Sequence, residues 1–588
     1  MIRRVVPLLA VALLLACAPA AGAHALLEGT SPQRGASLDR APGQVVLRFS
    51  ESVEVAFGAV RVYDARGGQV QQGDPFHPGG DPRAVAVRLR SGLADGGYTA
   101  TYRVISADSH PVSGGFVFGV GKAAAPAATV GDLLAGAKAG PVTSVAFSVV
   151  RALQFGAIAL AVGALILLLA VWLPALAALA VPGAGWDAAA GAFAARWRGA
   201  LLAAAAAGLA ASLLGLVLQA AVAEGTTFWD ALGDVPDVLS TRFGTVWGLG
   251  ALAWVAVGAL ALPARAAAPA VRPATVGAAG VAVARAGWWT AALAVPLAWL
   301  VLLPALGGHA GVRAPVAVLL PANVLHVIAA SAWIGGLALL VLALPAAAAR
   351  LDPPDRTRLL TGAVGRFSAL APVAVALLLA GGILQSVLEL DALDDLWDTA
   401  YGRAIIVKSG LVAGLLALGY RNRRRTLPAL GREAEAGASP GRPGRTLRRA
   451  LRAEVALGVA ALAVTGALAG YSPSSATATG PYSASVDLGP ARAELTVEPA
   501  TAGPNEVHLY LFKRSDGSQW DAARTLAVHA SLPSEGGAPI ALDARKAGPG
   551  HYVIGGAPLA PAGDWRLAVD ARVSEFDQYG ARFTVPVR

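Results

Sequence analysis

Residues 321–345 read PANVLHVIAASAWIGGLALLVLALP, a stretch that contains no Asp, Glu, Lys or Arg. An α-helix needs about 20 residues to cross a bilayer, and this stretch is longer. Similar apolar segments occupy residues 144–173, 199–222, 244–262, 287–307, 366–388, 404–420 and 451–470. The sequence therefore predicts a bundle of about eight transmembrane helices over residues 144–470.

The composition of the whole chain supports an integral membrane protein. Of its 588 residues, 55% are hydrophobic and 14% are charged, whereas soluble proteins carry about 25% charged residues. The net charge of +10 does not indicate a nucleic-acid partner, because the arginines cluster between apolar segments. Membrane proteins concentrate arginines in such loops, so the predicted partner is the lipid bilayer.

The charges of the connecting loops predict an orientation. Alternate loops carry arginines, among them Arg196, Arg265, Arg350 and the dense set within 421–452. The other loops are acidic, with Glu224, Asp230, Asp391 and Asp394. Basic loops face the cytoplasm. We therefore expect a multi-pass protein of the cytoplasmic membrane, with both chain ends of the bundle on the extracytoplasmic side.

Residues 1–23 resemble a signal peptide. Arg3 and Arg4 precede a short apolar region, and Ala21-Gly22-Ala23 fits the small-x-small cleavage pattern. Cleavage after Ala23 would make His24 the first residue of the mature chain. An alternative is a lipoprotein signal that ends at Cys17, which would leave His24 inside the chain.

Two further regions have the pattern of β domains. Residues 24–122 contain alternating segments at 44–50, 83–90 and 98–104, and residues 471–588 contain them at 493–497, 506–512 and 564–569. Short alternating segments separated by Gly, Pro and Asp predict β-sandwiches. Residues 123–143 read as a linker before the bundle. The expected architecture is an N-terminal β-sandwich, a helical transmembrane bundle and a C-terminal extracytoplasmic β-sandwich.

The first domain contains a candidate metal site. Asp108 and His110 are two residues apart, and in a strand such residues point to the same face. If His24 begins the mature chain, its amine and its imidazole Nδ1 can chelate the same ion. Together these groups form a tetragonal nitrogen and oxygen set, which Cu(II) prefers.

Sulfur ligands are almost absent from the sequence. The chain has one Cys and one Met, at positions 17 and 1, and both would leave with the signal peptide. Because Cu(I) prefers soft sulfur ligands, the predicted site favours Cu(II). Taken singly, an Asp-x-His pair or an N-terminal His is more often structural, and only their combination in one domain indicates a metal.

The first domain resembles the CopC family of periplasmic copper-binding proteins. The resemblance rests on HALLEGTSP at 24–32, LRFSE at 47–51 and YRVISADSHPVSGGF at 102–116. It implies a cupredoxin-like or immunoglobulin-like β-sandwich in which His24, Asp108 and His110 bind Cu(II). The Met-rich loop of family members with a Cu(I) site is missing. His77 lies near the place of that loop and is expected to be an exposed loop residue, with a weak accessory metal ligand as the alternative.

The bundle resembles the CopD family of copper-resistance membrane proteins over residues 140–475. The matching text includes the segment around His326, GRFSALA at 365–371, YGRAIIVK at 401–408 and LRAEVAL at 451–457. Ionisable residues inside membrane segments are costly and often functional. His309 and His326, at neighbouring ends of two spans, are therefore candidates for a copper path. Gln154, Gln219, Gln385 and Lys408 are expected to serve packing or the membrane interface.

The last domain resembles YtkA-like modules often found behind CopD. It contains His508, His529 and His551, which we expect to be separate structural residues in a domain with a structural or docking role. The whole sequence predicts no enzyme. It predicts Cu(II) binding outside the cytoplasm coupled to copper transfer or import, in contact with other copper-handling proteins. Alternatives are copper sequestration or sensing without transport, and a haem-binding membrane oxidoreductase.

Overall fold

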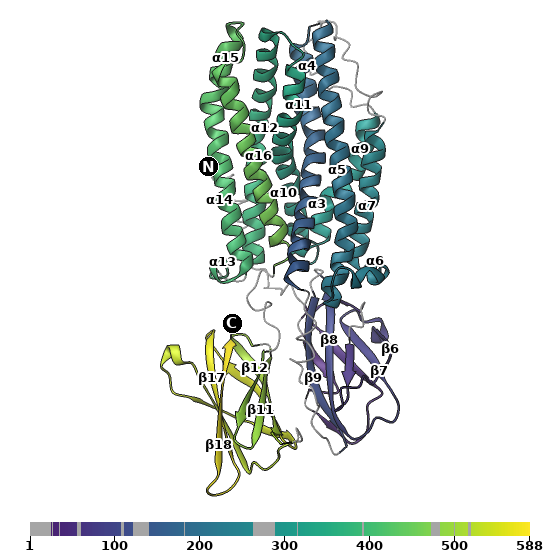
Figure 1. The fold of residues 1–588 in the computed structure, drawn as a ribbon, viewed down its shortest axis with the longest axis vertical. Helices are drawn as coiled ribbons and strands as arrows, with labels where there is room; N and C mark the ends of the chain where they lie inside the picture. The colour runs from purple at the N-terminus through teal and green to yellow at the C-terminus, as the bar shows by residue number, and fades with distance from the viewer. Residues whose placement is uncertain are drawn as a thin grey trace, which may run out of the picture. The chain divides into compact units, whose positions relative to one another are not determined.

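The computed structural model describes residues 25–121, 140–262, 288–471 and 482–587, apart from 26, 35, 56–59, 108–110, 182, 314, 391–392, 499 and 516–518. Two compact units form within this part of the chain. One holds the helices of 141–219 and 242–473, and the other holds both β domains and residues 220–241. The expected sequence of β domain, helical bundle and β domain is confirmed (Figure 1).

The N-terminal domain is made of two β-sheets. The first has the order β1 (Leu27–Ser31), β3 (Gln44–Phe49), β7 (Ala84–Leu89) and β6 (Gln71–Phe76). The second has the order β2 (Ser37–Leu38), β9 (Pro111–Val120), β8 (Gly96–Ser106) and β4 (Val53–Glu54), with β5 (Val60–Tyr63) also paired to β8. A short 3₁₀ helix spans Pro78–Gly80.

Alternation explains how the sheets of this domain pack. Along β3, the side chains of Val45, Leu47 and Phe49 are buried, while the residues between them are more exposed. These side chains share one core with residues of the second sheet, including Tyr102 and Phe118. Successive residues of a strand point to opposite faces, so one face of each sheet lines the core of the sandwich.

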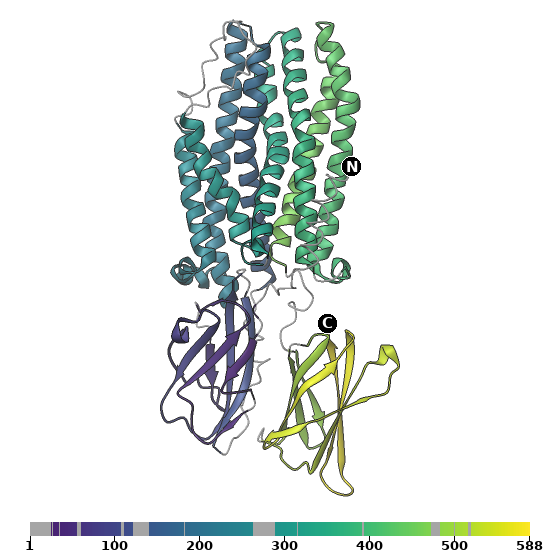
Figure 2. The same cartoon turned by 180° about the vertical axis from the view of Figure 1, so that it is seen from behind.

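The bundle has eight helical segments long and apolar enough to span a membrane within the described residues. Its helices are α3 (Pro141–Leu167), α4 (Leu173–Leu179), α5 (Ala184–Glu224), α6 (Val235–Ser240), α7 (Arg242–Ala261), α9 (Trp288–Leu306), α10 (Val316–Ala330), α11 (Gly336–Ala348), α12 (Pro353–Glu389), α13 (Asp395–Asp398), α14 (Ala400–Arg421), α15 (Leu427–Glu435) and α16 (Arg442–Leu468). The long helices run side by side in both views (Figure 2). The expected count of about eight spans is confirmed.

Three of the spans contain a π-helical turn within the residues that the structure describes. These turns cover Leu168–Trp172, Ser331–Gly335 and Asn422–Thr426, and they join α3 to α4, α10 to α11 and α14 to α15. The middle turn packs closely on α3, because a Cβ atom added at Gly163 would lie 2.7 Å from the backbone of Gly335. Small residues allow such close approach between membrane helices.

The C-terminal domain is also a pair of sheets. One has the order β10 (Tyr482–Leu488), β11 (Ala491–Glu498), β12 (Gly503–Lys513), β16 (His551–Leu559) and β15 (Arg545–Gly548). The other has the order β14 (Ile540–Leu542), β13 (Thr525–Ser531), β17 (Gly563–Arg572) and β18 (Gln578–Val587). A single apolar core, with Trp565 and Phe583 among its members, draws residues from both sheets.

Candidate metal-binding sites

The three ligands predicted for the first domain lie outside the described residues, but the segments beside them are placed. Strand β8 ends at Ser106 and strand β9 begins at Pro111, so Asp108 and His110 belong to the connection between these paired strands. Ala25, which follows His24, is buried in the core of the domain. The chain is therefore anchored directly after His24.

The strand register brings both segments to one end of the domain. Leu27, at the start of β1, is opposite Phe49 in β3. Val53, four positions further along the chain, is opposite Ser106 at the end of β8. Because a strand rises only about 3.3 Å per residue, the start of β1 and the end of β8 lie at the same end of the sandwich.

His77, which we expected to be exposed, is partly buried instead. Its Nδ1 lies 2.8 Å from the carbonyl oxygen of Ala84, a contact that holds the residue before the 3₁₀ helix against β7. The local reason is that a hydrogen bond to the neighbouring strand orders the ring. His77 therefore makes a structural contact with β7.

In the bundle, the imidazole of His326 is held in a defined orientation. His326 lies in α10, which packs on α12, and its Nδ1 is 2.9 Å from the carbonyl oxygen of Leu378 in α12. A carbonyl oxygen only accepts, so in the neutral ring Nδ1 carries the proton and Nε2 presents its lone pair. Metal-binding histidines are commonly oriented by such a bond from their other nitrogen.

An amide oxygen that has no hydrogen-bond partner among the described residues lies one turn from His326. Asn323 and His326 are three positions apart in α10 and so share a face of the helix. The Nδ2 of Asn323 donates to the Oε1 of Gln385 at 2.8 Å, but its buried Oδ1 has no hydrogen-bond partner among the described atoms. Buried polar atoms are rarely left unpaired, and an amide oxygen can also serve as a metal ligand.

Further polar residues cluster where α12 ends and α14 begins. The phenol of Tyr401 donates to the carboxyl group of the buried Glu389. Lys408 is near enough to interact electrostatically with both Glu389 and His326. Lys408, predicted to be an interfacial residue, thus lies within electrostatic range of two ionisable groups of the bundle. Gln385, predicted to serve packing, does link α12 to α10.

His309 is placed only through its backbone. It begins a short helix, His309–Gly311, that packs against α9 and α10. The position of its side chain lies outside the described residues. The prediction that His309 and His326 act together is therefore carried forward as a proposal.

The C-terminal domain brings together two histidines that we expected from the sequence to be separate. The Nδ1 of His508 in β12 lies 3.2 Å from the Nε2 of His551 in β16. The Nε2 of His508 lies 3.2 Å from the Oε1 of Glu506. His529 is in β13, a strand of the other sheet. Alternation in 506–512 indicated the strand, but no pattern indicated that β12 would pair with β16.

No group of three or more His, Cys, Asp or Glu side chains is arranged around a possible ion in the described part of the chain. The first candidate site depends on residues outside that part. The sites in the bundle and in the last domain each offer fewer than three such groups. Any ion bound there would need further ligands from water, amide oxygens or a partner.

Two family models match the chain. The CopC domain matches residues 27–121 and copper resistance protein D matches residues 361–468. The first match contains Asp108 and His110 but begins after His24. The second contains Leu378, the hydrogen-bond partner of His326, but not His326 or His309.

Similar proteins extend these matches. The copper transport protein CutJ of Bacillus subtilis (strain 168) is 27% identical over 574 residues, which cover 96% of this chain and 95% of that protein. Copper resistance protein C of Pseudomonas syringae pv. tomato is 33% identical over 105 residues, 17% of this chain and 82% of that protein. The crystal structure of CopC from Methylosinus trichosporium OB3b is 31% identical and covers 16% of this chain and 93% of its own, with a TM-score of 0.16. The chain belongs to the copper-resistance CopC–CopD family.

Proposed function

We propose that this protein binds Cu(II) outside the cytoplasm through His24, Asp108 and His110. The observation that carries the proposal is the strand register, which brings the start of β1 and the end of β8 to one end of the domain. A mature chain that begins at His24 would offer its amine, its imidazole, a second imidazole and a carboxylate there. Such nitrogen and oxygen sets suit Cu(II).

The second part of the proposal is that copper passes from this domain into or across the membrane. A relative of almost the same length is a copper transport protein. His326 supports a path through the bundle, because the bond to Leu378 places the proton on Nδ1 and leaves the lone pair on Nε2. One turn away lies the Oδ1 of Asn323, which has no hydrogen-bond partner in the described part of the chain. His309, at the end of the neighbouring helix, would add a second imidazole at the entrance.

The proposed orientation follows from the even number of spans and from the loop charges. Eight candidate spans would return the chain to the side from which it entered, so both β domains would lie on one side of the membrane. The arginine-rich loops would face the cytoplasm. Because the N-terminal domain is tethered to the bundle, the effective concentration of the copper-loaded domain beside the bundle is also raised.

An electron paramagnetic resonance spectrum of the full chain with Cu(II) tests the first site. With a native N-terminus, we expect a tetragonal spectrum with nitrogen ligands. One extra residue before His24 should remove the amine from the chelate and change the spectrum. Identical spectra for the two forms would contradict the role of the amine. A mature chain that begins at a residue other than His24 would also contradict it.

Copper accumulation by cells or vesicles tests transfer. His326→Ala should reduce accumulation to the level of an empty control, while His529→Ala, which changes a histidine in the last domain, should accumulate as the wild type does. If wild type, His326→Ala and the empty control all accumulate equally, transfer is excluded and sequestration is favoured. A haem absorption band in the purified protein would favour the oxidoreductase instead.

A further inference from the structure

The outer face of the C-terminal sheet carries an ordered row of polar and aromatic residues. Along β12, Val507, Leu509 and Leu511 belong to the apolar core. The residues between them, including His508 and Tyr510, therefore point to the opposite face. His508 is 6% exposed and Tyr510 is 8% exposed, so this face is covered although it lies outside the core.

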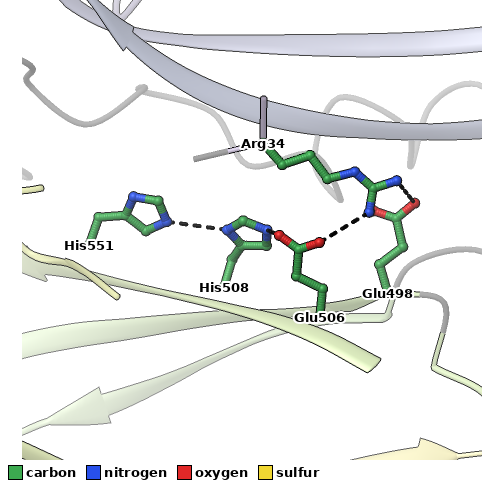
Figure 3. A network of polar contacts seen from close by, with 5 residues as sticks. All are labelled: Arg34, Glu498, Glu506, His508 and His551. Carbon is green, nitrogen blue, oxygen red and sulfur yellow. Dashed lines mark hydrogen bonds and ion pairs between the residues drawn. The ribbon is translucent and has the colours of Figure 1, made fainter. Parts of the chain in front are cut away.

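The neighbouring strand β16 adds its first residue to the same face. His551 is opposite Tyr510 in the register, and the two rings stack with centroids 4.4 Å apart and planes 11° apart. This stacking brings the Nε2 of His551 to 3.2 Å from the Nδ1 of His508. Figure 3 shows both rings with Glu506 on the far side of His508.

Glu506 fixes which nitrogen of His508 meets His551. Its Oε1 is 3.2 Å from the Nε2 of His508, and a carboxylate can only accept, so the neutral ring carries its proton on Nε2. The Nδ1 lone pair is then directed at His551. The other carboxylate oxygen of Glu506 is 3.6 Å from a guanidinium nitrogen of Arg34, which also pairs with Glu498 at 3.3 Å (Figure 3).

The nitrogen separation matches two ligands of one metal ion. Metal–imidazole bonds are about 2.0–2.1 Å long, so two nitrogens 3.2 Å apart subtend an angle of about 100° at a shared ion. Tetrahedral and tetragonal sites have angles in this range. A linear two-coordinate ion would need the nitrogens about 4 Å apart with the same bond lengths.

A metal bound by both rings would exclude the contact between their nitrogens. A metal would replace the hydrogen bond between the rings, and the His551 proton would move to its own Nδ1.

We propose that His508 Nδ1 and His551 Nε2 form a further metal site in the last domain, with Glu506 as the residue that positions His508. The ion is Cu(II), since imidazole sites bind it more tightly than other divalent first-row ions and since the proposed function supplies copper on this side of the membrane. Any further ligands would be water or other donors that reach this covered face. A site with two protein ligands is suited to receive and release copper.

Copper binding by the full-length protein in detergent tests this site. Cu(II) is titrated against a competing chelator, and the number of bound ions is compared among variants. His551→Gln keeps a polar side chain of similar reach and should lose one bound ion relative to wild type. The matched control is His529→Gln, a histidine of the same domain in the other sheet, which should keep the full number. Equal numbers for wild type and His551→Gln would overturn the proposal.

Two more variants separate this site from its neighbours. Glu506→Gln keeps both imidazoles, so the number of bound ions should stay the same. The affinity for one of these ions should fall by about 10–100-fold, as it does when an orienting carboxylate is lost. Unchanged affinity in Glu506→Gln would overturn its positioning role. Asp108→Asn with His110→Gln tests the first domain alone. If this double variant binds as many ions as wild type while His551→Gln binds one fewer, the proposed function fails and the site of the last domain stands.

Discussion

The imidazole of His326 lies against the backbone of Gly382. A Cβ atom added at Gly382 would be 3.2 Å from the Cε1 of the ring, which is closer than carbon atoms pack at their optimal separation of about 3.5–4.0 Å. A Cβ atom added at the neighbouring Gly381 would be 3.3 Å from the Cβ of His326. Glycines at this point of α12 therefore leave room for the histidine in α10.

Gly382→Ala should move the ring of His326 and reduce copper accumulation, because the added methyl group displaces Cε1. Gly365→Ala is the matched control, since it lies in the same helix and an added Cβ there meets no atom within 4 Å. We expect the control to accumulate copper as the wild type does and to be as stable or more so, as alanine favours helices over glycine. Equal copper accumulation by both variants would show that accumulation does not depend on the position of the His326 ring.

The bond from Tyr401 to Glu389 predicts a stability effect in the bundle. Tyr401→Phe leaves the ring in place but removes the donor from a buried carboxyl group. We expect a loss of about 1–3 kcal/mol in the free energy of unfolding, the range for an acceptor left without its partner. Thermal unfolding in detergent measures it. Tyr420→Phe, in the same helix with a side chain 64% exposed, should change little, and equal loss in both would contradict the prediction.

The helical part of the fold could be predicted because each span is a continuous run of apolar residues, which can be recognised without knowing its neighbours. The apolar run at 321–345 marks a segment that the structure extends from Val316 to Ala348. The π turn at Ser331–Gly335 within it was not predicted, since the change of hydrogen-bond pattern depends on packing against α3 and not on apolar character.

The candidate sites were less accessible to sequence reasoning. His326 was singled out because a histidine in a membrane segment is unusual, but its bond to Leu378 joins residues 52 positions apart. The pair of His508 and His551 depends on the register between β12 and β16. Alternation shows that a residue lies on one face of a strand, and it does not show which strand is the neighbour.

The pKa of His551 predicts how the last domain responds to acid. An unfolded histidine has a pKa near 6.5, and the folded value is about 3. The unfolded state therefore binds more protons between these values, so stability is present above pH 6.5 and is lost as the pH falls toward 3. The expected loss is up to about 1.4 kcal/mol for each pH unit.

Hydrogen exchange of β12 and β16, followed by mass spectrometry, measures this local stability. His551→Gln removes the titrating group, so the difference in stability between pH 6.5 and pH 4 should be smaller than in the wild type. His529→Gln should retain the wild-type pH dependence. The prediction is wrong if His551→Gln and wild type lose protection in parallel as the pH is lowered.

Gly114 in β9 is opposite Tyr102 in β8, and the phenol ring lies over the glycine. A Cβ atom added at Gly114 would be 2.6 Å from the Cζ of Tyr102, and the ring is buried in the core of the domain. Gly114→Ala should therefore destabilise the N-terminal domain by about 1–3 kcal/mol, as overpacking of a core does.

The same substitution should weaken Cu(II) binding at the first site, because β8 and β9 flank the segment of Asp108 and His110. Protection of β8 and β9 from hydrogen exchange reports the stability, and titration against a chelator reports the affinity. Gly29→Ala is the matched control, since Gly29 is in β1 of the same domain and an added Cβ meets no atom within 4 Å. If Gly114→Ala lowers protection but leaves Cu(II) affinity equal to that of Gly29→Ala, the site does not depend on the pairing of these two strands.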